Sequence, residues 1–202
     1  MDFEALFISE VKPYKGKSRK DKFLSRIFGI FNEEIIRIWC ENKKSPFTNI
    51  GRPTIYDSNG KYFTLDFLLK DTENRLFVTE MKCEIEYQKY KYLTLNESKQ
   101  LRHHCSKRAF ELFLELSHTP KKYDVRCNNK NQNIAGTALV WGRTSTSGEV
   151  EIKQKFKINH VISTEKVVAD LIEWEDEEFK IFINSYKGWA NQLFDGLLGN
   201  CA

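Results

Sequence analysis

The chain has 202 residues, of which 41% are hydrophobic and 30% charged, so it can bury a core of ordinary size and is not disordered. It contains no run of eighteen apolar residues, and its first residues, MDFEALFISEVK, lack the basic start and apolar middle of a signal peptide. We therefore expect a soluble, cytoplasmic protein with no membrane partner. The net charge of +4 permits a nucleic-acid partner without requiring one.

The first half of the chain predicts a helix followed by three strands. Over residues 20–42 the apolar residues recur at intervals of three and four, which is typical of an amphipathic helix. Residues 50–56 predict a strand that forms a hairpin with residues 62–63. Residues 64–70 and 76–85 predict two further strands, because a short polar stretch with turn chemistry separates two apolar ones.

The second half predicts a helix, two or three strands and a helical end. Residues 97–117 have amphipathic helical spacing, and residues 135–142 are apolar as in a core strand, with a short strand at 123–126. Residues 149–160 alternate apolar and charged side chains and predict a half-exposed strand with a basic face. Residues 160–202 are helical in pattern and could close the core, face DNA or form the surface of a homodimer.

Three charged residues interrupt the two apolar strands at 64–85. Asp66 lies between Leu65 and Phe67, while Glu80 and Lys82 lie two residues apart and thus on one face of their strand. An isolated charge inside a sheet costs several kcal/mol, on the order of 2 to 5, unless it is paired or binds a metal. Two carboxylates on neighbouring strands can hold Mg²⁺, and a nearby lysine can orient or deprotonate a water or neutralise a phosphate.

The hairpin motif resembles a known nuclease superfamily. Asp66, thirteen intervening residues, and then Glu80, Met81 and Lys82 on an apolar strand are similar to the PD-(D/E)XK nucleases, which include restriction endonucleases. Leu65 stands where the family's name has proline. The resemblance implies a Mg²⁺-dependent DNA endonuclease, with Mn²⁺ as a substitute cation. By this resemblance, Asp66, Glu80 and the Met81 carbonyl hold the metal, and Lys82 acts on the attacking water.

The resemblance also implies a fold. It is a restriction endonuclease-like α/β core with a mixed central β-sheet flanked by helices, in the order α-β-β-β-α-β. An extra C-terminal strand and helices follow this core. Because no repeat or linker divides the chain, we predict a single domain over residues 1–202, with 160–202 as a helical elaboration.

Many of these nucleases supply one more glutamate from the helix before the strands. On the helix at 20–42, Glu34 borders the apolar stripe and Glu33 lies one step nearer solvent. Glu34 is the preferred candidate and Glu33 the reserve, although a glutamate at the edge of an amphipathic helix needs no function.

The candidate DNA-binding residues follow the hairpin. Lys89 and Lys91 alternate with aromatic residues, an arrangement that can track a phosphate backbone and stack on bases. Lys99 and Arg102 lie on the basic side of the helix predicted at 97–117. The alternative for the first two is an aromatic cover on the sheet with lysines reaching past it into water.

Two other interpretations stay open at this point. The tripeptide pattern Glu-x-Lys recurs five more times in the chain, so the motif alone is weak and its strand context carries the argument. The chain could have kept a nuclease fold without turnover, as a DNA-binding or assembly protein. The three charges could also be ordinary surface charges on an unrelated α/β protein.

Overall fold

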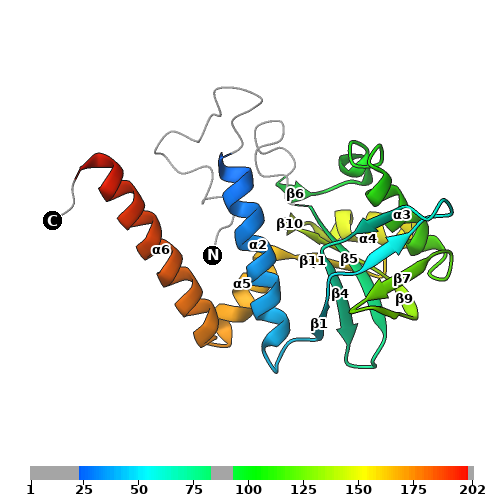
Figure 1. Ribbon diagram of the computed structural model, residues 1–202, viewed down its shortest axis with the longest axis horizontal. Coiled ribbons are helices and arrows are strands. Elements are labelled where there is room, and N and C mark those ends of the chain that lie inside the picture. The colour runs from blue at the N-terminus through cyan, green and yellow to red at the C-terminus, as the bar shows by residue number, and fades with distance from the viewer. Residues whose placement is uncertain (1–22, 83–92, 200–202) are drawn as a thin grey trace.

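A five-stranded mixed sheet lies at the centre of the computed structural model, which describes residues 23–82 and 93–199 (Figure 1). The strand order is β1-β4-β5-β9-β11. Their bounds are Phe47–Gly51, Phe67–Asp71, Leu76–Lys82, Ile134–Trp141 and His160–Ser163, in that order. Strands β1, β4 and β5 are antiparallel neighbours, whereas β9 runs parallel to both β5 and β11. Helices cover both faces, so the chain has a mixed α/β fold.

The β4–β5 hairpin is confirmed, and Asp71 closes it. The Asp71 carboxylate accepts hydrogen bonds from the backbone N–H of Glu73 (3.0 Å) and of Arg75 (2.8 Å). Asn74 adopts the left-handed conformation (φ 62°) that asparagine tolerates in turns. The first of the two strands begins at Phe67, later than predicted, so Asp66 lies just before it.

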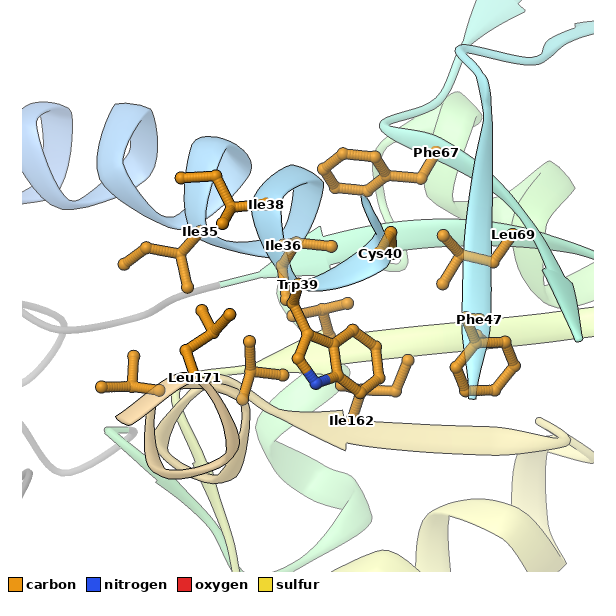
Figure 2. Close-up of a cluster of buried hydrophobic side chains, with 14 of the residues drawn as sticks. Ile35, Ile36, Ile38, Trp39, Cys40, Phe47, Phe67, Leu69, Ile162 and Leu171 are labelled. Atoms are coloured by element: carbon orange, nitrogen blue, oxygen red, sulfur yellow. The ribbon is translucent and has the colours of Figure 1, made fainter. Parts of the chain in front are cut away.

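One face of the sheet is covered by α2 (Phe23–Glu41), α5 (Thr164–Glu173) and α6 (Glu177–Leu198). Figure 2 shows Trp39 of α2 between the sheet residue Phe47 and Leu171 of α5. The Trp39 indole N–H donates to Asp170 Oδ2 (3.1 Å), which joins α2 to α5. This half of the core fixes the position of α2, and with it that of Glu33 and Glu34.

The opposite face is covered by α3 (Arg108–His118) and α4 (Thr146–Phe156). Phe110 and Phe113 of α3 pack with Val78 of β5 and Leu139 of β9. Since side chains alternate along a strand, Glu80 and Lys82 share the α3-facing side with Val78.

Two smaller sheets complete the structure. The first has the order β3-β2-β7-β8, with bounds Tyr62–Thr64, Thr54–Tyr56, Asp124–Cys127 and Lys130–Asn131. Its β2–β3 pairing and β7 confirm the predicted hairpin and the short strand at 123–126. The second pairs β6 (Thr94–Leu95) with β10 (Arg143–Thr144), beyond the carboxyl end of β9.

Residues 149–160 are mostly helical, and the predicted strand there is wrong. Gly148 and Ile152 are buried and Phe156 is half-buried, and these residues are four apart. Residues four apart share a face in a strand and also lie on one side of a helix, whereas Val150, which belongs to the same alternation, is exposed. Ser145 begins α4, because its hydroxyl accepts the backbone N–H of Gly148 (3.1 Å).

Residues 97–117 are not one helix. A 3₁₀ helix, η1 (Ser98–Leu101), is followed by turns with i to i+3 bonds, such as His104 N–H to the Leu101 carbonyl (3.0 Å). The buried His104 ring lies against Trp141 of β9, with ring centroids 6.2 Å apart. Packing against the sheet thus overrides the helical spacing, and α3 begins only at Arg108.

The C-terminal region is not wholly helical either. His160–Ser163 is strand β11, paired in parallel with β9, and the helices begin at Thr164. The central elements come in the order α2-β1-β4-β5-α3-β9, as in the predicted α-β-β-β-α-β order, while the extra C-terminal strand lies at 160–163 and not at the predicted 149–160. Helix α6 then leans away from α2 (Figure 1) and exposes Trp189, Leu193 and Leu197. Within the described residues, no helix is long and apolar enough to cross a membrane.

Candidate active site

Asp66 and Glu80 face each other across β4 and β5. The two strands pair as far as Phe67 with Thr79, and the next residues along are Asp66, just before β4, and Glu80 in β5. Residues directly opposite on antiparallel strands place their side chains on the same face. The two carboxylates are close enough for the charge of Asp66 to raise the pKa of Glu80. The structure therefore brings these two predicted site residues together.

Lys82 completes the cluster. Its ammonium donates to Glu80 Oε1 and to the backbone carbonyl of Met81 (3.1 Å). The Lys82 side chain is only 18% exposed, because it also lies over the Phe110 ring of α3 at 6.0 Å from the centroid. The ammonium is thus held at the carboxyl end of β5, beside the Glu80 carboxylate.

Glu80 is a buried carboxylate with an unusual titration. Burial raises its pKa from an ordinary value of 4.5 to about 7, and the charge of Asp66 adds to this effect. The ammonium groups of Lys82 and Lys107 oppose the shift. A strongly raised carboxyl pKa in a charged cluster is typical of catalytic and ligand-binding sites. Any additional cation beside Glu80 would stabilise the ionised form of its carboxyl group.

The oxygen atoms at the site suit a hard divalent cation. The backbone N–H of Met81 donates to Asp66 Oδ2 (2.6 Å), which holds that carboxylate beside β5 and leaves Oδ1 outside this bond. Asp66, Glu80 and the Met81 carbonyl together offer only oxygen, the donor that Mg²⁺ and Mn²⁺ favour. The described parts of the chain contain no group of three or more histidine, cysteine, aspartate or glutamate side chains suited to a metal. A cation held here would therefore complete its coordination with water, as Mg²⁺ commonly does.

Glu33 and Arg52 border the cluster. Arg52, in the loop between β1 and β2, places Nη2 3.7 Å from Asp66 Oδ1 and Nη1 4.0 Å from Glu33 Oε2. Of the two helix glutamates considered from the sequence, Glu33 is thus the one linked to Asp66.

Glu34 has other partners. Its carboxylate accepts from Arg37 Nη2 (2.6 Å) and Nε (3.0 Å), and these bonds hold the pKa of Glu34 below its ordinary value. Arg37 also contacts Glu41 of α2 and Glu178 of α6. Glu34 therefore belongs to an ion-pair network between α2 and α6, and the structure does not bring it to the site.

The candidate DNA-binding residues divide into two pairs. Lys89 and Lys91 lie outside the described residues. Lys99 and Arg102 are exposed, and Lys99 approaches Glu97 (3.6 Å). Lys99 and Arg102 follow β6, and β6 pairs with β10, which comes just after β9. Both residues therefore lie towards the carboxyl ends of β5 and β9, the end of the sheet that also carries Lys82.

Sequence reasoning missed two cations of the site. Arg52 lies in a loop and Lys107 directly precedes α3, and neither position has a periodic pattern that would indicate its neighbours. The Gly-Arg-Pro triplet at 51–53, which interrupts an apolar strand, is the one local signal for Arg52. Long-range contacts such as these come only from the tertiary structure.

No known family model, curated protein or solved structure matches the chain.

Proposed function

We propose that the protein is a Mg²⁺-dependent endodeoxyribonuclease with a restriction endonuclease-like fold, acting at the cluster of Asp66, Glu80 and Lys82. The observation that supports it most is the meeting of two carboxylates and one ammonium at the ends of neighbouring strands. One of these carboxylates is buried and has a pKa raised to about 7. The order of the central elements, α-β-β-β-α-β, also supports the proposal.

Each residue has a defined part in this proposal. Asp66 Oδ1, Glu80 and the Met81 carbonyl would hold the cation, which when bound polarises the phosphate and acidifies water. Lys82 orients the attacking water or stabilises the charge that develops on the phosphate. The hydrogen bond from the Met81 N–H keeps Asp66 in place for its part.

The substrate is proposed from the surrounding charges. Lys99 and Arg102 are exposed at the same end of the sheet as the site, and Lys107 acts electrostatically on Glu80. Together with Lys89 and Lys91, they would contact phosphates on either side of the one that is cut. Phosphate contacts of this kind bind DNA independently of its sequence.

A second candidate has one observation in its favour. The charges of Asp66 and Glu80 are matched by those of Lys82 and Arg52, so the cluster is neutral without a metal. Such a cluster suits a DNA-binding or assembly protein that has the nuclease fold but no turnover.

A cleavage assay separates the two candidates. Purified protein is incubated with supercoiled plasmid, branched DNA and single-stranded DNA in Mg²⁺, Mn²⁺ or Ca²⁺. The enzyme should nick or cut DNA in Mg²⁺ or Mn²⁺ and be inactive in Ca²⁺, which binds oxygen ligands with looser geometry. DNA binding without cleavage of any substrate would instead support the inert protein. Absence of both binding and metal uptake would reject both candidates.

A further inference from the structure

Arg52 contacts two acidic groups of the candidate site from a loop. Its guanidinium lies between Asp66, just before β4, and Glu33 on α2, at 3.7 and 4.0 Å. Both distances exceed that of a hydrogen bond, and the Arg52 side chain is 60% exposed. The attraction is therefore electrostatic, and the side chain is not locked by it.

The backbone under Arg52 is fixed, in contrast to the side chain. The carbonyl of Pro53 accepts the N–H of Leu65 (2.9 Å), which ties the loop to the residue before Asp66. Gly51 has φ 137°, a conformation that favours glycine, and its N–H donates to Asn49 Oδ1 (3.0 Å). Arg52 is thus presented to the site by an anchored loop.

The two oxygens of Asp66 have different partners. Oδ2 accepts the Met81 N–H, so Oδ1 is the oxygen left for a cation. Oδ1 is also the atom that Arg52 approaches. A divalent cation at Asp66 and Glu80 would therefore meet the guanidinium at the same oxygen.

We propose that Arg52 competes with the divalent cation for Asp66 Oδ1 and, once displaced, binds a phosphate group of the substrate. This inference rests on the proposed nuclease function and adds a positioning residue to it. A guanidinium stays charged at any working pH, and its planar set of donors matches two phosphate oxygens at once. Arg52 then protects the acidic cluster before the metal binds and holds the substrate afterwards.

The test compares metal binding with catalysis. Mn²⁺ is titrated calorimetrically into metal-free wild type, Arg52→Ala and Arg52→Lys, and plasmid cleavage is measured for each. Arg52→Ala should bind Mn²⁺ about three- to tenfold more tightly, because an opposing charge is gone, yet cleave at least about tenfold more slowly. Arg52→Lys, which keeps the charge, should bind Mn²⁺ like wild type and still cleave more slowly.

The control is Arg75→Ala. Arg75 is also half-exposed and bridges two carboxylates, Asp71 (2.7 Å) and Glu73 (3.3 Å), but at the opposite end of β4 and β5. This variant should lose stability without a change in Mn²⁺ affinity.

The outcomes separate the two proposals. If wild type binds Mn²⁺ and cuts DNA while Arg52→Ala binds Mn²⁺ no more tightly, or cuts as fast as wild type, the role of Arg52 is wrong and the nuclease stands. If wild type neither binds Mn²⁺ nor cuts, the nuclease proposal and the role of Arg52 fail together.

Discussion

Asp66 and Glu80 stand opposite each other at the open end of the β4–β5 hairpin, and the charge of Asp66 raises the pKa of Glu80. Like charges across a sheet are destabilising unless a cation lies with them. Lys82 supplies one such cation from β5 and Arg52 a weaker one from a loop. The arrangement is therefore a candidate for cation binding as well as for catalysis.

The contribution of Glu80 to the stability of the metal-free protein should fall as pH rises from 4.5 to about 7. Over this window the unfolded chain has lost the Glu80 proton, while the folded protein keeps it because its pKa is about 7. The stabilisation from this proton is fully present below 4.5 and is lost as pH rises through the folded pKa. Thermal unfolding in a chelator, measured across this range, shows the trend.

Glu80→Gln provides the comparison. The glutamine cannot ionise, so the difference in melting temperature between this variant and wild type should grow with pH and level off above about 7. A difference that stays constant with pH would contradict the raised pKa.

Lys82→Ala should reduce cleavage by about 10² to 10⁴-fold, the usual contribution of a positioned acid or base. DNA binding should be nearly unchanged, because Lys82 is largely buried beside Glu80 and is assigned to the chemical step. Single-turnover cleavage and a DNA-binding titration measure the two effects separately.

Lys180→Ala is the matched control for Lys82→Ala. Lys180 pairs with Glu177 (2.6 Å) on α6, away from the hairpin. The Lys180→Ala variant should cleave DNA at the rate of wild type. If Lys82→Ala lost DNA binding and cleavage equally, Lys82 would act in DNA binding and not in the chemical step.

Replacing both Lys99 and Arg102 by alanine should weaken binding to every DNA sequence and lower the slope of log affinity against log salt by about two units. Fluorescence anisotropy at several salt concentrations measures this slope. The control replaces Lys121 and its neighbour Lys122. Lys121 lines a groove together with Leu76 and Ile134, the first residues of β5 and β9. If the control pair flattens the slope and the first pair does not, DNA binds at the other end of the sheet.

The predictions from sequence succeeded where a pattern is local. The β4–β5 hairpin has a turn signal between two apolar runs, and its alternation alone places Glu80 and Lys82 on one face. They failed where two periods coincide, as at Ile152 and Phe156, whose spacing of four satisfies a strand and a helix equally.

The site itself could be predicted only in part. Asp66, Glu80 and Lys82 lie on one hairpin, so a short stretch of sequence contains them. The choice between Glu33 and Glu34 depends on how α2 packs and on the partners that Arg37 finds in α6, which no local spacing specifies. Arg52 reaches the site through its loop, and for the same reason local spacing could not place it beside Asp66.

Cleavage of supercoiled plasmid by wild type and by Asp66→Asn in Mg²⁺ tests the central claim most directly. The asparagine oxygen can still accept the Met81 N–H, so the fold should persist, but a neutral amide is a weaker ligand for a divalent cation. The account predicts that wild type nicks or linearises the plasmid and that Asp66→Asn leaves it supercoiled. Cleavage by Asp66→Asn at the rate of wild type, or none by wild type, would contradict it.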